Sequence, residues 1–478
     1  MRDRASRVIW WAGILASTLI AAVAVLLFAT QLTDLGRHFP GALGRAGVGV
    51  SATVLGLAAI ALRLYLRGSL RRPPGWLAMP WSGLALLVLT RAIAVAFVDA
   101  PFSSDPKFIH LLAVGVLHGG DPVAAHRPMG YSTLLAGVYA VFGPDRHLAE
   151  LLNLALALIT GLLLFGMTRD AFGRRAASAA LVLYAIAPAQ ILLVVPSLTE
   201  IFYAMLLVAA VWAAIGVGRR GLVAAVASGA LLALSQYVRP LSQALLAGFV
   251  LLPLLVKWSL RRAAVLGAAV VITFIVVLIP IVSHNLSYYG ELSVSSSSYG
   301  GYSLFVGTDQ KHNGMFNQED AELLAAQPGR TWWERSEAMG PLGLKHIVDD
   351  PLGFAGLAVR KFWVLWSGEN YGVVWSMRDD RLDPRVPATL LVLGQAFYAG
   401  LTSLVAWVLY RERHRRPPLA LLIVMLLLIV VVGHTFVEVQ SRYHAYMIPL
   451  FCALGGLALA GAKGRPTPNE HGPVSLRA

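Results

Sequence analysis

The sequence predicts an all-α polytopic membrane protein, a bundle of about 12 transmembrane helices whose outer loops carry short helices. Of its 478 residues, 57% are hydrophobic and only 13% are charged, whereas a soluble protein is about one quarter charged. The mean hydropathy of +0.67 is correspondingly high, and apolar runs long enough to cross a bilayer recur along the chain. This composition excludes a soluble enzyme and a disordered chain.

A bilayer core takes about 20 apolar residues per helix. A shorter apolar stretch, 131–142, is predicted to be a re-entrant or interfacial helix. The first span follows Arg2, Arg4 and Arg7 and is predicted to be an anchor helix, because its apolar core is too long for a signal peptide. The predicted spans are 8–30, 46–66, 77–98, 148–168, 177–195, 199–217, 222–238, 240–256, 263–283, 387–410, 418–434 and 445–462.

The net charge of +14 is explained by membrane topology. With both termini placed in the cytoplasm, the predicted inner segments hold 21 Lys and Arg with four acids, a net charge of +17. All other residues together carry −3. This distribution follows the positive-inside rule. The basic residues are therefore not evidence for nucleic-acid binding.

The same topology divides the chain into regions. Two long polar loops face outward: 99–147, which is part of the predicted core, and 284–386, which carries amphipathic helix candidates such as 358–366. The regions are 1–76 (two extra helices), 77–283 (transmembrane core), 284–386 (large outer loop), 387–462 (C-terminal helices) and 463–478 (a disordered cytoplasmic tail).

The first outer loop contains the main catalytic candidate, Asp105. A carboxylate at a helix start is often a cap, and the alternative is a general base at the outer membrane surface. Asp99 is either a second acid near the same site or an interfacial anion. Arg91, in the outer part of the preceding span, is expected either to snorkel to the surface or to pair with one of these acids.

Five further charged residues are predicted to face the same side. Arg127 precedes the short apolar helix and suits either a lipid phosphate or an interface anchor. Arg239-Pro240 separates two spans, where a break in the helices is expected. Glu200 begins a span, and Glu438 with Arg442 lies near the outer end of another. Together they form a ring of outward-facing charges.

No cofactor or metal is expected. His110, His118 and His126 with Asp121 match no compact ligand motif, and Cys452 is the single cysteine. No GxxxxGK[ST] phosphate-binding loop occurs, which argues against an intrinsic ATP motor.

The order of several motifs resembles a known family. The series SSDPKF, HRPMGYSTLLAGVYAVFG, APAQILLVVPSLTEIFY, LLALSQYVRPLSQALL and EVQSRYHAYMIPL is similar to the GT-C superfamily of integral membrane glycosyltransferases. Within that superfamily it resembles the branch of protein O-mannosyltransferases and bacterial aminoarabinose transferases. The match extends over most of residues 77–460.

This resemblance implies a GT-C-type helix bundle and a sugar donor linked to a polyprenyl phosphate. It implies that Asp105 is the catalytic Asp, with Asp99 as a possible second acid. It places the lipid phosphate and donor near Arg127, Arg239, Arg442 and Glu200. Arg91 is added to this predicted donor site because the predicted topology places it near the outer face.

The expected function is transfer of the sugar, with inversion, to a glycan, lipid or protein acceptor on the outer face of the bacterial cytoplasmic membrane. The alternative is a transporter or flippase of lipid-linked saccharides, a class that would show inverted repeats and midplane charges. The sugar, the prenyl length, the acceptor and the oligomeric state are not determined by the sequence.

Overall fold

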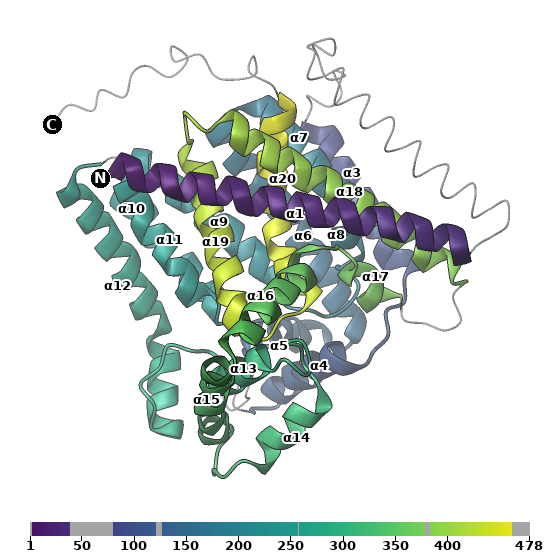
Figure 1. Cartoon of the computed structure of the whole chain (residues 1–478), viewed down its shortest axis with the longest axis vertical. Helices are drawn as coiled ribbons and strands as arrows, with labels where there is room; N and C mark the ends of the chain where they lie inside the picture. Colours follow the sequence, from purple (N-terminus) through teal and green to yellow (C-terminus); the bar gives the residue numbers. More distant parts are fainter. Residues whose placement is uncertain (1, 39–79, 121–126, 257, 378–382, 461–478) are drawn as a thin grey trace.

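The computed structural model describes residues 2–38, 80–120, 127–256, 258–377 and 383–460 (Figure 1). Every regular element in these ranges is a helix. In chain order they are α1 (Arg2–His38), α3 (Pro80–Phe97), α4 (Ser104–Leu117), α5 (Gly130–Phe142), α6 (Arg146–Phe172), α7 (Arg174–Ile186), α8 (Pro188–Leu192), α9 (Glu200–Arg220), α10 (Leu222–Gln236), α11 (Ser242–Leu255), α12 (Leu260–His284), the π-helix η2 (Asn285–Tyr289), α13 (Gly300–Thr308), α14 (Gln318–Ala326), α15 (Trp332–Asp349), α16 (Pro351–Trp366), α17 (Tyr371–Ser376), α18 (Arg385–Arg411), α19 (Pro418–Phe436), the 3-10 helix η3 (Ser441–Met447) and α20 (Ile448–Ala460).

Eight stretches in the described ranges are long and apolar enough to cross a membrane, and the chain is an integral membrane protein. They lie in α1, α3, α6, α9, α12, α18 and α19 and in η3 with α20. The predicted fold class, an all-α polytopic membrane protein, is confirmed. The short apolar stretch at 131–142 is helix α5, and the amphipathic segment 358–366 forms the end of α16.

One predicted span is wrong in detail. The stretch 177–195 is not one helix but two, α7 and α8, separated at Ala187. The cause is Pro188, which has no backbone N–H to continue the helix and restricts the residue before it. The predicted spans 222–238 and 240–256 are the shorter helices α10 and α11. The predicted span 46–66, the tail 463–478, Asp121 and His126 lie outside the described residues.

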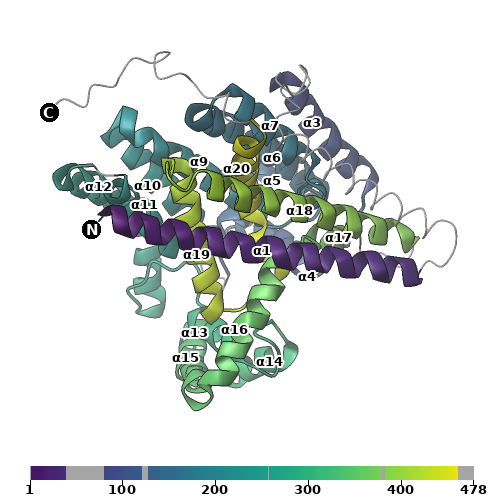
Figure 2. The ribbon, with the colours of Figure 1, turned by 45° about the horizontal axis from the view of Figure 1, so that its top comes forward.

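Helices α19 and α20 form the centre of the bundle. Their side chains are apolar on nearly all sides and buried, as expected for helices surrounded by other helices. Helix α20 packs against α7 and α18, while α1 runs across the bundle alongside α18 (Figures 1 and 2).

The two ends of the bundle differ in composition. At one end, three segments predicted to be cytoplasmic meet: Arg2 Nη1 donates to the carbonyl oxygen of Trp258 at 2.6 Å, and Arg416 forms an ion pair with Asp3 at 2.6 Å. At the other end lie α4, α5 and α13 to α15, which come from the two predicted outer loops (Figure 1).

Candidate functional site

Asp105 lies in the first turn of α4, and its carboxylate is held by two arginines. Arg127 Nη1 donates to Oδ1 and Arg442 Nη2 donates to Oδ2, both at 2.5 Å. The preceding residue, Ser104, has a φ of 52°, a left-handed conformation that is rare outside glycine. Such strained backbone persists only where the surroundings fix it. The bonds from Asp105 to Arg127 and Arg442 are part of the surroundings that hold the start of α4 in place.

Glu200 begins α9 and is almost completely buried, with 1% of its side chain exposed. Its Oε1 accepts a hydrogen bond from Arg239 Nη2 at 2.5 Å and lies 3.5 Å from Arg442 Nε. Arg442 thus lies between the two carboxylates. The result is one continuous chain of charges, which we call the arginine–carboxylate network: Arg127, Asp105, Arg442, Glu200 and Arg239.

Close backbone contacts bring these residues together. The helices break between α10 and α11, as Arg239-Pro240 predicts, and Arg239 lies in that break. The Gly130 N–H donates to the carbonyl oxygen of Tyr237 at 2.9 Å. A Cβ at Gly130 would lie only 2.8 Å from that carbonyl group, so glycine is required there. This contact fixes the Arg127 segment beside the Arg239 segment.

The segment that leads into α9 is held by Asn153, a residue of α6. The Asn153 side chain donates to the carbonyl oxygens of Val194 and Pro196 at 3.2 and 3.0 Å, and it accepts a hydrogen bond from the Tyr131 hydroxyl at 2.8 Å. These bonds give hydrogen-bond partners to two backbone carbonyls of the segment just before Glu200, which is not helical.

Arg442 projects from η3, and its side chain is 8% exposed. Its guanidinium lies over the Trp375 ring, 4.4 Å from the centroid, and Arg442 Nε donates to Gln440 Oε1 at 3.1 Å. Gln440 and Tyr443 both donate to Glu438, at 2.8 and 3.2 Å. Burial raises the pKa of the Glu438 carboxyl. Glu438 is thus a secondary partner that reaches Arg442 through Gln440.

The electrostatics of Asp105 are a balance of opposing effects. Its burial raises the pKa of the carboxyl, but the charges of Arg442 and Arg127 outweigh this and lower the pKa below its ordinary value. The network contains three guanidiniums and two carboxylates, so it carries an excess positive charge. Arg127 is its most exposed member, with 40% of its side chain accessible.

Two predicted site residues lie outside this network. Asp99 is 74% exposed and pairs with Arg146 at 3.0 Å. Arg91 is fully buried and donates to the carbonyl oxygens of Tyr184 and Ala185 at 2.6 and 2.5 Å. The Tyr184 carbonyl would bond the N–H of residue 188 in a continuous helix, but that residue is proline. Arg91 therefore caps the broken end of α7.

The predicted histidines do not come together where the structure describes them. His110 bonds the Tyr139 hydroxyl at 2.8 Å, and His118 bonds the carbonyl oxygen of Val114. A different group within the described ranges, Asp309, His312 and Asp320, brings three potential ligand atoms within 4.8 Å of one another. His312 already bonds Asp309 there at 2.5 Å.

Sequence reasoning missed four contributors to the site: Trp375, Gln440, Tyr443 and Tyr299. Tyr443 also lies under the Arg239 guanidinium, 5.1 Å from the ring centroid, and Tyr299 interacts electrostatically with Arg127. Gln440 and Tyr443 lie close to Arg442 in the motif EVQSRY, so their position in that motif is the signal that could have identified them. Tyr299 and Trp375 come from the large outer loop, where nothing in the sequence separates them from other aromatic residues.

Comparison with known proteins gives structural similarity only. No family model matches the sequence, and no curated protein matches it. The structure is similar to the Archaeoglobus fulgidus oligosaccharyltransferase AglB solved with an inhibitory peptide and a dolichol-phosphate, at 16% identity and a TM-score of 0.46. That match covers 79% of this chain and 50% of the other, so the chain spans about half the length of the archaeal protein.

A second similar structure is ArnT from Cupriavidus metallidurans bound to undecaprenyl phosphate. It has 14% identity and a TM-score of 0.35, and the match covers 79% of this chain and 77% of ArnT. At these identities and scores the role of the site rests on the residues of this chain.

Proposed function

We propose that the protein is a membrane glycosyltransferase that moves a sugar from a polyprenyl-phosphate-linked donor to an acceptor hydroxyl. The observation that carries this proposal is the arginine–carboxylate network, which holds Asp105 at the end of an apolar bundle between Arg127 and Arg442. A potential base and an excess of guanidiniums thus lie together where lipid and water meet.

The network is suited to a lipid phosphate. Guanidinium groups bind phosphate through paired, charge-assisted hydrogen bonds. A phosphate at this end of the bundle can leave its prenyl chain in the bilayer beside the helices. Arg127 is the most accessible guanidinium and Arg239 the next one inward, at 40% and 17% side-chain exposure. We propose that they meet the phosphate first.

Binding of the donor would also activate Asp105. In the free protein the two arginines lower the pKa of Asp105, which keeps it ionised but makes it a weak base. Phosphate oxygens that take over the guanidinium hydrogen bonds would remove part of this stabilisation. The pKa of Asp105 then rises, and the carboxylate becomes free to accept a proton.

The reaction follows from these positions. The acceptor oxygen attacks the anomeric carbon, its proton passes to the Asp105 carboxylate, and the bond from the anomeric carbon to the phosphate oxygen breaks. Polyprenyl phosphate leaves with the bonding electron pair, and Arg127, Arg239 and Arg442 stabilise its charge. A single displacement inverts the anomeric configuration. General-base help of this kind contributes about 10²–10⁴ in rate.

We further propose that this site faces outward from the bacterial cytoplasmic membrane, with both termini in the cytoplasm. The positive-inside distribution supports this orientation, as do the contacts of Arg2 with Trp258 and of Arg416 with Asp3 at the opposite end. An outward site needs a donor that is already carried on a lipid, because nucleotide sugars are cytoplasmic. The acceptor is a glycan, a lipid or a protein.

The decisive experiment is a transfer assay on the purified full-length chain in liposomes. The chain is incubated with a panel of radiolabelled polyprenyl-phosphate sugars and with glycan, lipid and peptide acceptors. We expect transfer from at least one donor and a fall of about 10²–10⁴ in the Asp105→Asn variant. Asp99→Asn is the matched control: it removes a carboxylate from the same loop that pairs only at the surface, and it should keep the wild-type rate.

Two outcomes would contradict the proposal. Full transfer activity in Asp105→Asn removes that residue as the base. Absence of transfer with every donor, together with counterflow of a lipid-linked saccharide across the liposome membrane, identifies a transporter instead. Charges gathered at one end of the bundle favour the transferase, because a carrier would hold them near the midplane.

A further inference from the structure

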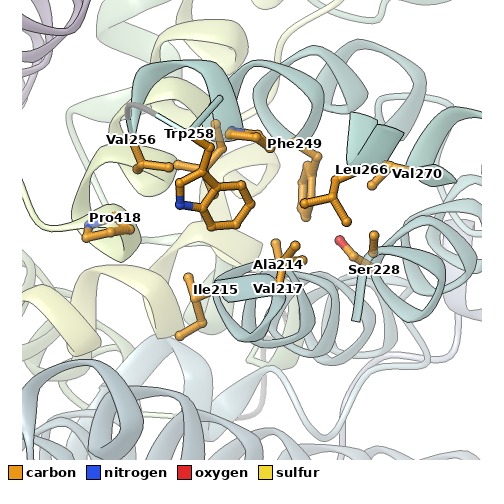
Figure 3. A pocket seen from close by; sticks show the side chains of 13 residues that line it. Ala214, Ile215, Val217, Ser228, Phe249, Val256, Trp258, Leu266, Val270 and Pro418 are labelled. Atoms are coloured by element: carbon orange, nitrogen blue, oxygen red, sulfur yellow. The ribbon is translucent and has the colours of Figure 1, made fainter. Parts of the chain in front are cut away.

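A cavity lies at the end of the bundle opposite the arginine–carboxylate network. Its volume is about 230 Å³, and it is lined by the far end of α9, by α10, α11 and α12, and by Pro418 at the start of α19 (Pro418–Phe436). Ala214 lines it, 14 residues along α9 from Glu200, which corresponds to about 21 Å of helix. Apart from Ser228, the side chains around it are apolar. They include Ala225, and also Phe249, Leu266 and Val270, which are labelled in Figure 3.

Trp258 connects this apolar cavity to two cations. Its indole lies among the lining side chains (Figure 3). The Arg262 guanidinium is 4.8 Å from the centroid of the same ring, and Arg2 Nη1 donates to the Trp258 carbonyl oxygen at 2.6 Å. The nearby carboxylate of Asp3 is already paired with Arg416 and Arg7, at 2.6 and 3.3 Å. Trp258 therefore lies between the apolar cavity and two positively charged side chains, Arg2 and Arg262.

This combination defines the chemistry of a ligand. An anionic head would bind Arg2 and Arg262 while an attached hydrocarbon chain filled the cavity. A soluble anion would leave the apolar space empty, and a neutral lipid would supply no negative charge to the two arginines. The prenyl chain of the donor fits poorly, because its phosphate belongs at the other end of α9.

We propose that the cavity binds one acyl chain of an anionic phospholipid from the leaflet at this end, with the phosphate of the lipid on Arg2 and Arg262. This site is separate from the proposed transfer site, and only the exclusion of the prenyl chain as its occupant rests on the proposed function. Bound there, the lipid ties the N-terminus of α1 to the start of α12.

The test measures lipid binding to the purified full-length chain by native mass spectrometry. The probes are dioleoyl phosphatidylglycerol and dioleoyl phosphatidylcholine, which share their acyl chains and differ in charge. We expect at least tenfold tighter binding of phosphatidylglycerol. Arg262→Gln should remove that preference, whereas Arg174→Gln, an exposed arginine at the start of α7, should retain it.

A second variant tests the cavity itself. Ala214→Leu fills the space with a larger apolar side chain, so binding of both lipids should fall at least tenfold. The unfolding midpoint without added lipid shows whether the variant is folded, and Ala225→Val is the smaller change if it is not. Equal affinity for the two lipids in the wild type, unchanged binding in the filled variant, or displacement of phosphatidylglycerol by polyprenyl phosphate overturns the proposal.

Discussion

Arg442 and Arg91 are both buried arginines of the same bundle, and their guanidiniums have different kinds of partner. Arg442 lies between two carboxylates, those of Asp105 and Glu200, and rests on the Trp375 ring. Arg91 bonds two backbone carbonyls that Pro188 leaves without N–H partners, and it lies over the Tyr184 ring.

The difference separates a site from a structural support. Backbone carbonyls at a helix end stay where they are, so a ligand that took Arg91 away would leave the buried Tyr184 carbonyl without the hydrogen bond that Arg91 gives it. An arginine that bonds a carboxylate can instead exchange it for a phosphate, and the released carboxylate can then gain a proton. A buried cation is therefore evidence for chemistry only when its partners can be exchanged.

The largest expected effect concerns Glu200, the inner carboxylate of the network. Glu200→Gln keeps the shape but leaves Arg239 and Arg442 short of one negative charge in a buried place. Breaking a buried ion pair in this way costs about 3–5 kcal/mol of stability. Denaturant unfolding measures it, and Glu150→Gln, whose carboxylate pairs with His147 outside the network, serves as the control. Wild-type stability in Glu200→Gln would mean that Glu200 does not balance the two arginines.

A smaller loss of stability is expected at Arg91. Arg91→Met removes the bonds to the Tyr184 and Ala185 carbonyls, but the Ala185 carbonyl keeps the hydrogen bond from Thr90 Oγ1, so the net loss is that of one charge-assisted hydrogen bond, about 1.5–3 kcal/mol. The folded fraction should nevertheless bind polyprenyl phosphate as the wild type does, whereas Arg442→Met should bind it at least tenfold more weakly. Equal weakening in both variants would remove the distinction between the two arginines.

The smallest effect is a shift in pH dependence, on the order of one pKa unit or about 1.4 kcal/mol. A base works when deprotonated, so the rate falls as the pH drops through its pKa. The profile of kcat/KM reports the free enzyme, in which the pKa of Asp105 lies below its ordinary value. The profile of kcat reports the donor complex, and its acid limb should lie at higher pH. Coincident acid limbs would show that the donor does not displace the arginines from Asp105.

The sequence was sufficient to predict which charges gather at one end. Asp105, Arg127, Glu200, Arg239 and Arg442 were each placed on the same side of the membrane by span positions, and the break at Arg239-Pro240 followed from proline geometry. Their pairing order was not predictable, because Asp105 and Arg442 are 337 residues apart and a single sequence contains no signal for such a contact.

Two predicted site residues, Asp99 and Arg91, lie outside the network because each has a different partner close by. Asp99 pairs with Arg146, a partner that the sequence offers no reason to prefer. For Arg91 a signal was present but unused: Pro188 within the predicted span 177–195 both breaks that helix and creates the carbonyls that Arg91 bonds. Hydropathy alone treated that stretch as one helix because its residues on both sides of the proline are apolar.

The central claim is that a lipid phosphate and Asp105 compete for the same guanidiniums. The most direct measurement is the affinity of the purified full-length chain for undecaprenyl phosphate, compared between the wild type and Asp105→Asn. In the wild type, the phosphate must replace a charge-assisted hydrogen bond between Asp105 and an arginine, worth about 1.5 kcal/mol, which corresponds to a roughly tenfold change in affinity. We therefore predict that Asp105→Asn binds undecaprenyl phosphate more tightly than the wild type, by up to about that factor. Weaker binding in the variant would contradict the account, because it would mean that Asp105 helps to hold the phosphate instead of competing with it.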